Sequence, residues 1–430
     1  MNRRTLLATL SGAALQLQAQ KRDMIIHNSR QEGYEMPLAG FKDYITPVEH
    51  FFVRSHHLTP RIELDAWKLE VKGHVNGALT LSMPDLKAMK PVEMVAVLEC
   101  AGNGRGFYEP SMPGLQWEHG SVGNARWRGV RLADVLKRVG VKVGAKHVLF
   151  DGADVPVGAQ PEFQRTIPID KAMDPNTLLA FDMNGAALPA SHGFPLRVIA
   201  PGWAGDSWVK WVTRIEVLDK EFEGFFMKTG YRHPGRGVQP GLPVKPEEMK
   251  PVEAIQVKSV IATIGPKVSG TAWAGEKAVA TVEVSVDRGR TWKAAKITSP
   301  RTPFGWVTWE YDWQPPSGYY VVMARAHDTW GRTQPMAQEW NPSGYQWNVI
   351  HQVASETAPA PAAAAMEPPA VYKATCVGCH DEGPVRKQRL SRAQWEAEVG
   401  KMQRWGAPVK PETKDELLNY LVSRFGYRHR

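Results

Sequence analysis

Cysteine is scarce in this chain. Cys100, Cys376 and Cys379 are the only three among 430 residues. Two of them stand in one short motif, so a framework of structural disulfides is excluded if that motif serves other chemistry. Cys100 is therefore the only cysteine before Cys376, and the residues around it have to indicate its role.

Long apolar runs are also missing, except for a short one at the N-terminus. The stretch Leu6–Leu17 is too short to span a membrane comfortably. Arg3 and Arg4 precede it and small residues follow near Ala19, which predicts an export signal over residues 1–20 and suggests the twin-arginine route. An uncleaved membrane anchor is the alternative. Export would make the protein periplasmic, and this route carries folded, cofactor-loaded proteins.

No run of five or more lysines and arginines occurs, although the formal net charge is +9. A basic chain can bind nucleic acid, an anionic membrane surface, or anionic substrates and partners. Because no nucleic-acid motif is present either, we expect no nucleic-acid partner. The composition, 43% hydrophobic and 23% charged, is that of an ordinary globular protein with room for two or three domains.

Hydrophobic patterning divides the rest of the chain into four segments. Short strand-like runs alternate with helix-like patches over residues 33–240, which predicts an α+β domain. Period-two alternation over residues 250–350, with a turn at Asp287–Arg290, predicts an immunoglobulin-like sandwich. Alanine and proline dominate residues 353–370 and predict a semi-extended linker. Two helical patterns follow in residues 371–430.

The strongest local motif is CVGCH, residues 376–380. Cys-x-x-Cys-His is the pattern for covalent attachment of c-type haem, in which two thiols add to the vinyl groups and the histidine ligates iron. A zinc site or a redox dithiol is the alternative, but zinc would need a second ligand pair and the tail adds only His429. We predict haem c attached to Cys376 and Cys379, with His380 as an iron ligand.

The second iron ligand must be Met402 or a distant histidine. Met402 lies in the first of the two helical patterns, before the sharp loop that follows Trp405, and we choose it, although a core methionine is the more common use of this residue. The motif, a helix with Trp and Met, and a leucine-rich closing helix together resemble short class-I-type cytochrome c domains. That resemblance implies a small all-α haem domain with Met402 as ligand.

Cys100 lies in the loop LECAGNGRGFY, Leu98–Tyr108, after an apolar run that predicts a buried strand. Small residues in the loop let the backbone approach a ligand closely, and Asn103 and Arg105 offer donors to an anion. A soft thiolate at the end of a strand, beside an arginine and backbone amides, suits a soft metal bound to an anionic cofactor. A buried structural cysteine is the alternative.

Six sequence blocks resemble, in order and spacing, the molybdenum-cofactor domain of sulfite oxidases. They are FFVRSHH (51–57), LECAGNGR (98–105), WRGVRLADVL (127–136), AMDPNTLLAFDMNG (172–185), HGFPLRVIAPGWAGDSWVKW (192–211) and GFFMKTGYRHP (224–234). The β-rich region that follows resembles the dimerisation domain of the same family. The resemblance implies a molybdenum–molybdopterin cofactor and a homodimer.

The resemblance also implies a role for each matched residue. Cys100 would bind molybdenum through its thiolate, Arg54 would help to bind an anionic substrate, and Tyr231 would stand beside the metal and gate substrate, electron or proton movement. Arg105 lies in the block of Cys100 and joins the catalytic set. The residues implied to hold the pterin ring and phosphate are His56, Asp154, His192, Arg197, Trp208, Val209 and Lys210.

Sulfite is the substrate that these residues suggest. Its oxygens suit the paired donors of an arginine, and its sulfur carries a nucleophilic lone pair. Oxidation to sulfate yields two electrons, which a haem would pass singly to an external cytochrome. Two alternatives stay open: an enzyme for another sulfur compound, by sulfane oxidation or sulfoxide reduction, and a haem electron carrier with a non-catalytic scaffold. Gly104 stands where many family members have a second basic residue, which we expect to weaken the positive charge near the substrate.

Overall fold

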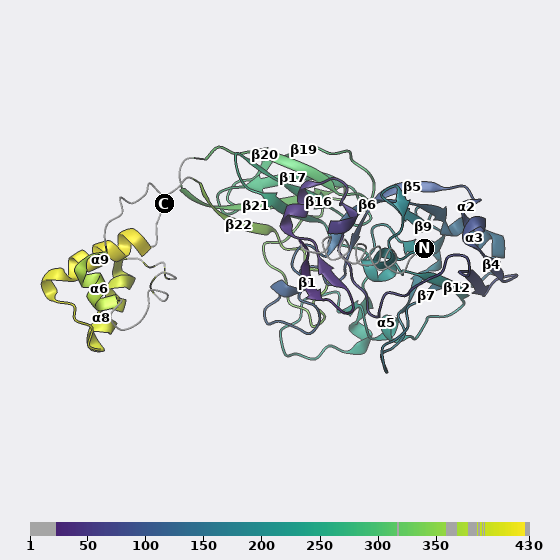
Figure 1. Cartoon of the computed structure of the whole chain (residues 1–430), viewed down its shortest axis with the longest axis horizontal. Coiled ribbons are helices and arrows are strands. Elements are labelled where there is room, and N and C mark those ends of the chain that lie inside the picture. The colour runs from purple at the N-terminus through teal and green to yellow at the C-terminus, as the bar shows by residue number, and fades with distance from the viewer. Residues whose placement is uncertain are drawn as a thin grey trace, which may run out of the picture. The chain divides into compact units, whose positions relative to one another are not determined.

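The computed structural model in Figure 1 describes residues 23–315, 318–357, 368–376, 385, 388, 390 and 392–425. The predicted export signal lies outside these residues, as do Cys379 and His380. The chain divides into two compact units. The first consists of Met1–Trp313 and Val322–Val353, and the second of Gln314–Val321 and Ala354–Arg430.

A five-stranded antiparallel sheet carries Cys100. Its strands are β10 (Ala186–Ala187), β9 (Leu178–Met183), β6 (Val122–Arg131) and β5 (Val92–Glu99) in that order, with β11 (Arg197–Ile199) paired to β9. β5 is the apolar run predicted from the sequence, and its last four residues are all buried. It pairs with β6 along its whole length, from Val92 opposite Gly129 to Glu99 opposite Val122. Cys100 therefore follows directly after a fixed strand end.

A second sheet lies in the same domain. Its order is β4 (Leu79–Leu81), β3 (Leu69–Gly73), β12 (Val212–Leu218), β7 (His147–Gly152) and β8 (Gln164–Pro168). The helices are α2 (Met83–Lys87), α3 (Leu132–Val139), α4 (Ile169–Met173) and α5 (Phe225–Lys228). α3 contacts β3 of this sheet and β6 of the first sheet, and it buries Leu132, Val135, Leu136 and Val139 at helical spacing. The two sheets thus share one core with α3, which is the α+β arrangement predicted.

Short elements complete this region. The strands are β1 (Ile25–Asn28), β2 (Gly33–Glu35), β13 (Arg232–His233) and β14 (Lys250–Pro251), and the 3-10 helices are η1 (Leu38–Lys42), η2 (Val48–His50), η3 (Arg105–Phe107), η4 (Ala190–His192), η5 (Gly205–Ser207) and η6 (Pro246–Glu248). Three of these helices, η3, η4 and η5, carry residues of the matched blocks.

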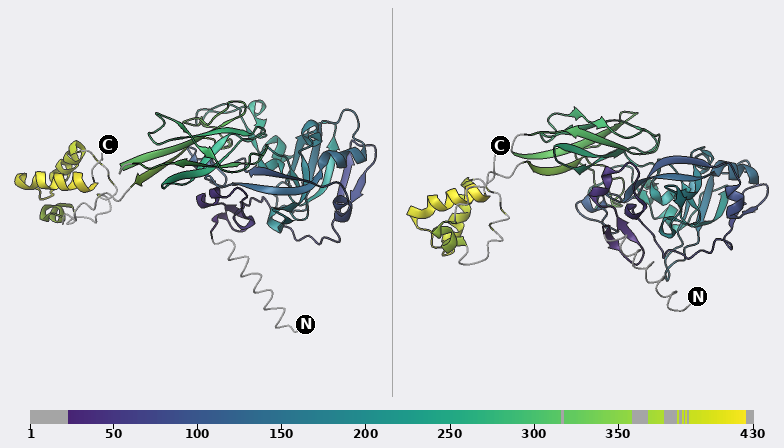
Figure 2. Two further views of the ribbon diagram at one scale, coloured as in Figure 1. Left: turned by 90° about the horizontal axis from the view of Figure 1, so that it is seen from above. Right: turned by 45° about the horizontal axis from the view of Figure 1, so that its top comes forward.

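Two four-stranded sheets form the predicted sandwich (Figure 2). One has the order β15 (Lys258–Thr263), β16 (Lys267–Trp273), β20 (Val307–Asp312), β19 (Lys296–Ile297), and the other β18 (Lys293–Ala294), β17 (Val279–Ser285), β21 (Gly318–Asp328), β22 (His351–Thr357). β17 contacts β16, β19 and β20 of the opposite sheet. The turn predicted at Asp287–Arg290 joins β17 to β18, with Arg288 and Gly289 in the left-handed region.

The sandwich packs directly on the strand that carries Cys100. The backbone N–H of Val97 in β5 donates to the carbonyl of Phe304 at 2.9 Å. Val97 and Ala101 share a buried cluster with Trp273 and Trp306 of the sandwich. β5 is therefore held by β6 on one edge and by the sandwich on the other.

The start of the predicted linker differs from the structure. β22 continues through Thr357, because exposed residues alternate with half-buried ones along HQVASE and the segment pairs with β21. Alternation at the strand period thus outweighs the alanine- and proline-rich composition that follows. Residues 358–367 lie outside the described residues.

The second unit contains helices α6 (Ala370–Cys376), α8 (Arg392–Arg404) and α9 (Pro411–Phe425), drawn in yellow-green to yellow in Figure 1. The last two are the helices predicted from the sequence. Trp395 and Val399 of α8 pack with Leu417 and Leu421 of α9 and with Tyr372 of α6 in a separate core. Among the described residues, no helix combines the length and apolarity needed to span a membrane.

Candidate active site

A cleft with an empty volume of about 680 Å³ lies in the α+β domain. Among its lining residues are nearly all of those predicted to form the site: Arg54, His56, Cys100, Asp154, His192, Arg197, Trp208, Lys210 and Tyr231. The fold therefore brings together side chains from five separate stretches of sequence. Val209 and Arg105 do not line this cleft.

Cys100 is the thiol of the cleft. Burial raises its pKa, while a hydrogen bond from the Gly102 backbone N–H and the charges of Arg105 and Arg54 act in the opposite direction. A thiol in this setting becomes a thiolate when a cation binds to it. The surroundings of Cys100 therefore suit a metal ligand.

Arg54, His56 and Tyr231 form a hydrogen-bonded row along the cleft. Arg54 Nη2 lies 3.1 Å from His56 Nδ1, and His56 Nε2 lies 2.7 Å from the Tyr231 hydroxyl. Burial, followed by the charge of Arg54, holds the pKa of His56 well below its ordinary value. His56 is therefore neutral, accepts from Arg54 at Nδ1 and donates to Tyr231 from Nε2.

Tyr231 is held in an unusual conformation. Its φ of 54° lies in the left-handed region, which is rare for a bulky residue. Burial raises the pKa of its hydroxyl, so Tyr231 stays protonated at neutral pH. Because it accepts from His56, its own proton is available to a ligand in the cleft.

Arg197 is a buried cation that also lines the cleft. Its Nη1 and Nη2 donate to the carbonyls of His192 and Trp208 at 3.0 and 3.1 Å, and burial lowers its pKa to about 9. Within the described residues, its Nε has no hydrogen-bond partner. A buried guanidinium with an unused donor fits an anionic ligand.

Lys210 is the second cation and is half-buried. Its Nζ donates to Ser55 Oγ at 2.7 Å and to the Ser191 carbonyl at 2.9 Å. Burial and then the charge of Arg197 lower its pKa to about 7. In the part of the chain that the structure describes, neither Lys210 nor Arg197 forms an ion pair with a carboxylate. A phosphate would supply the charge that both lack, so these residues fit the terminal phosphate of a molybdopterin.

The remaining predicted cofactor contacts differ in their surroundings. Asp154 lines the cleft, and burial raises its pKa against the charges of His57 and Lys210. Trp208 lines it too and is fixed by a hydrogen bond from its Nε1 to the Trp203 carbonyl at 3.0 Å. Val209 is buried behind the cleft, where its carbonyl accepts from Val198 N–H.

Arg105 belongs to the Cys100 loop but does not line the cleft. Its guanidinium carbon stands 4.8 Å from the ring centroid of Tyr345. Tyr345 in turn stacks on Tyr231, with centroids 5.6 Å apart and planes 12° apart. Arg105 thus packs on Tyr345 next to the cleft, and its charge also acts on Cys100. Tyr345 was not predicted from the sequence.

Gly104 faces the same side of the loop and not the cleft. Its φ is 89°, and a Cβ built there would lie 2.4 Å from Trp347 Cδ1. A side chain at this position would therefore meet Trp347. The expectation that Gly104 removes a charge next to the substrate does not fit this geometry.

A buried ion pair borders the cleft and was not predicted. Arg165 Nη2 lies 2.5 Å from Asp206 Oδ2, with side-chain exposures of 1% and 0%. Burial raises the pKa of Asp206 to about 6, and Arg165 opposes that rise. Arg165 also stands 5.4 Å from the centroid of Tyr231. In the sequence, each residue stands out only as the one charged residue of a short stretch. Arg165 is the only charge in QRTIP, and Asp206 is the only charge in GDS.

The helical unit has a cavity of its own, with an empty volume of about 500 Å³. It is lined by Cys376 and Met402, together with apolar residues such as Trp395, Val399 and Leu421. Burial raises the pKa of the Cys376 thiol to about 11. The cavity thus places a thiol and a thioether against a largely apolar lining, which Gln388 and Glu398 also border.

Comparison with known proteins gives the family. Residues 56–226 match the oxidoreductase molybdopterin binding domain, and residues 241–358 match the Mo-co oxidoreductase dimerisation domain. Sulfite oxidase of Gallus gallus is 34% identical over 337 residues, which cover 72% of each chain. Mitochondrial sulfite oxidase of Homo sapiens is 34% identical over 73% of this chain and 62% of its own length.

Two further relatives carry other names. Nitrate reductase [NAD(P)H] of Hordeum vulgare is 33% identical over 72% of this chain and 39% of its own length. The crystal structure of the sulfane dehydrogenase SoxCD from Paracoccus pantotrophus superposes with a TM-score of 0.68 and 28% identity, covering 77% of this chain and 86% of that one.

These matches confirm some of the predictions made from the sequence and leave others untested. The chain spans about three fifths of the length of the mitochondrial relatives, and both family matches end before the CVGCH motif. The molybdopterin-binding fold and the dimerisation domain are confirmed, whereas the cytochrome c domain stays a prediction. The chain belongs to the sulfite oxidase family of molybdopterin-dependent oxidoreductases.

Proposed function

We propose that this protein is a periplasmic sulfite dehydrogenase that oxidises sulfite to sulfate and passes the electrons singly through a tethered c-type haem to an external cytochrome. One observation carries the proposal. A single half-buried thiol, Cys100, shares its cleft with three cations, Arg54, Arg197 and Lys210. This combination suits a metal with an anionic cofactor and an anionic substrate, and sulfite oxidases are among the relatives.

Each side chain has a task in this proposal. Molybdenum–molybdopterin, when bound, supplies the oxygen-atom chemistry and takes up two electrons. Cys100 ligates the metal, and Arg197 and Lys210 neutralise the phosphate. His192, Asp154 and Trp208 would border the pterin with polar groups and an aromatic face, and Val209 would support them from behind the cleft.

Arg54 and Tyr231 act on the substrate. The Arg54 guanidinium attracts sulfite and holds its oxygens by charge-assisted hydrogen bonds. His56 keeps the Tyr231 hydroxyl oriented by donating to it at 2.7 Å. The Tyr231 proton then hydrogen-bonds to the substrate or product oxygens. Arg105 supports this arrangement through Tyr345, against which both Arg105 and Tyr231 pack.

The tail serves as the electron exit in this proposal. Cys376 and Cys379 attach haem, and His380 and Met402 ligate its iron. Cys376 and Met402 border one apolar cavity, which supports the haem assignment. The dimerisation domain supports a homodimer.

A second candidate is oxidation of sulfane sulfur. The similarity to a sulfane dehydrogenase covers most of both chains and favours this reaction over sulfoxide reduction. Nitrate reductases among the relatives add nitrate to the compounds that have to be compared. All of these reactions would use the same cleft and differ in the compound that Arg54 receives.

The test is a comparison of substrates with purified, molybdenum-loaded protein. We expect sulfite to reduce added cytochrome c with one sulfate formed per two electrons, and thiosulfate to reduce it at a far lower rate. Dimethyl sulfoxide and nitrate are electron acceptors, and we expect them to reoxidise the dithionite-reduced protein only slowly. Cys100→Ser should lose at least ~100-fold in rate while its haem spectrum is unchanged. Preference for a sulfane donor, or full sulfite activity in Cys100→Ser, would contradict the proposal.

A further inference from the structure

We propose that Lys258 and Glu99, an ion pair buried between the sandwich and the Cys100 loop, are positioning residues for the Cys100 thiolate. The sandwich would then set the geometry and the electrostatics of the metal site in addition to its part in dimerisation. The inference rests on the proposed function only in taking Cys100 as the metal ligand.

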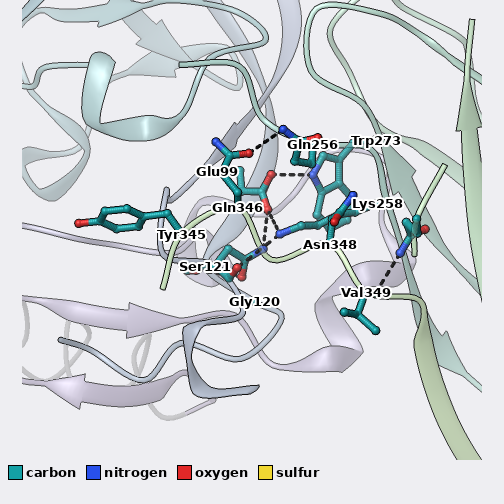
Figure 3. A network of polar contacts seen from close by, with 12 residues as sticks. Glu99, Gly120, Ser121, Gln256, Lys258, Trp273, Tyr345, Gln346, Asn348 and Val349 are labelled. Atoms are coloured by element: carbon teal, nitrogen blue, oxygen red, sulfur yellow. Dashed lines mark hydrogen bonds and ion pairs between the residues drawn. The ribbon is translucent and has the colours of Figure 1, made fainter. Parts of the chain in front are cut away.

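Lys258 and Trp273, which face each other on neighbouring strands, both donate hydrogen bonds to the Glu99 carboxylate (Figure 3). Lys258 begins β15, Trp273 ends β16, and the two are directly paired in the sheet register. Lys258 Nζ lies 2.5 Å from Glu99 Oε1, and Trp273 Nε1 donates to Glu99 Oε2 at 2.9 Å. The side chains of Lys258 and Glu99 are 9% and 3% exposed, so water screens this pair little.

The carboxylate is also the first member of a closed ring of hydrogen bonds around Cys100. Asn103 Nδ2 donates to Glu99 Oε1 at 2.8 Å, and Ser121 Oγ donates to Asn103 Oδ1 at 2.9 Å. The Cys100 backbone N–H donates to the Ser121 carbonyl, and the Asn103 N–H donates to the Cys100 carbonyl, both at 2.9 Å. Both backbone groups of Cys100 are thus fixed by residues that the Glu99 carboxylate orients.

The ion pair and the cleft lie on the two sides of Cys100. Cys100 lines the main cleft, and it also lines a smaller cavity together with Glu99 and Lys258. The loop is therefore a thin wall between the proposed metal and a fixed pair of charges. A buried ion pair is rarely the most stable way to fill a core, and this one stands beside the residue whose position matters most.

The chain offers a matched control. Lys171 of α4 lies 3.2 Å from Glu276 of the sandwich, and Trp203 Nε1 donates to the same Glu276 oxygen at 2.9 Å. This second lysine–glutamate–tryptophan group also joins the two domains. It neither lines the cleft nor belongs to the Cys100 loop.

The two single substitutions leave opposite charges beside Cys100. An electrostatic effect should therefore shift a property of the metal in opposite directions, whereas a general loosening of the loop should shift it in the same direction in both variants. Lys258→Met removes the ammonium group and leaves the Glu99 carboxylate with its hydrogen bonds from Trp273 and Asn103. Glu99→Gln leaves an ammonium group. We expect the reduction potential of molybdenum in the holoprotein to fall in Lys258→Met and to rise in Glu99→Gln, with the double variant closer to the wild type.

Two further readouts accompany the potentials. The electron paramagnetic resonance signal of Mo(V), generated with dithionite and therefore independent of substrate, should shift in both single variants. The kcat for sulfite should fall by ~10–100-fold with little change in KM. Lys258→Arg keeps the charge and should restore the wild-type potential, which decides the matter if Glu99→Gln does not fold. Lys171→Met and Glu276→Gln should leave the potential and the signal unchanged.

Unchanged potential and signal in Lys258→Met, or shifts in the same direction in both single variants and in the control pair, would overturn the inference. Absence of sulfite turnover in the wild type would instead contradict the proposed function. The dithionite measurements would still test the ion pair in that case.

Discussion

Arg197 is buried and Lys210 is half-buried, and among the described residues neither cation has a carboxylate partner. Charged groups in such surroundings destabilise the folded protein until an anion arrives. Burial accordingly lowers the pKa of Lys210 from 10.5 to about 7. At the scale of single residues, these two cations therefore lower the stability of the cofactor-free protein, and binding of an anionic cofactor would raise it again.

A pH dependence follows for cofactor-free protein. The folded state releases the Lys210 proton near pH 7, whereas the unfolded chain retains it to about pH 10.5. The destabilisation is fully present below pH 7 and diminishes as the pH rises toward 10.5. Urea unfolding should show that Lys210→Met stabilises the cofactor-free protein by about 1 to 3 kcal/mol more at pH 6.5 than at pH 9.5. A difference that does not change with pH would show that Lys210 is not held in this way.

The same substitution should act in the opposite direction on the loaded protein. Lys210→Met removes the charge that we assign to the cofactor phosphate. Molybdenum content after purification should fall, while Lys210→Arg should retain more of it. Equal molybdenum content in all three proteins would contradict the phosphate assignment.

Residues inside the matched sequence blocks could be predicted to lie near one another. Residues whose place at the site depends on contacts between distant parts of the chain were missed. Arg54, His192 and Arg197 line one cleft as the blocks implied. Lys258 and Tyr345 belong to the sandwich, and nothing in their local sequence connects them with Cys100. The Arg105 side chain packs on Tyr345, so its position outside the cleft could not be predicted from the sequence either.

At the scale of elements, the Cys100 loop depends on a glycine in a left-handed turn. Gly104 has φ 89° and a Cβ there would overlap Trp347, whereas Gly241 has φ 85° and open space around it. Gly104→Ala should therefore destabilise the protein by about 2–4 kcal/mol, and Gly241→Ala by only about 1 kcal/mol. Urea denaturation measures both. Equal losses would mean that Trp347 does not restrict this position.

Elements with a regular pattern were predicted well. The apolar run predicted before Cys100, VEMVAVLE, forms β5, and β21 lies in the region where period-two alternation predicted strands. β6 was missed because glycines, arginines and an asparagine interrupt its apolar pattern, and its burial comes from its position between β5 and β9. α6 was missed because seven residues of a short helix give too little periodicity.

At the scale of the whole molecule, the chain joins an oxidoreductase domain to a helical unit with a separate core. Met402 and Cys376 line the cavity of that unit. Met402→Ala should lower the reduction potential of the haem, because a methionine ligand raises it. Trp405→Ala is the control, since Trp405 is 73% exposed and does not line the cavity. A potential unchanged by Met402→Ala would assign the second iron ligand to another residue.

The order of the domains was readable from composition and periodicity, whereas their contacts were not. The alternation of residues 250–350 predicted a sandwich, but not that its Phe304 would pair with β5 or its Lys258 with Glu99. Such contacts depend on the packing of whole domains. This is also why a domain known for dimerisation turns out to touch the Cys100 loop.

The central claim is that sulfite delivers electrons in the cleft and that the haem receives them. Anaerobic mixing of the oxidised, molybdenum-loaded protein with sulfite, followed by haem absorbance, tests it most directly. The account predicts haem reduction within a single turnover before any external cytochrome is added, and none in Cys100→Ser, whose haem dithionite still reduces. A haem that stays oxidised in the wild-type protein, or that is reduced equally in Cys100→Ser, would contradict it.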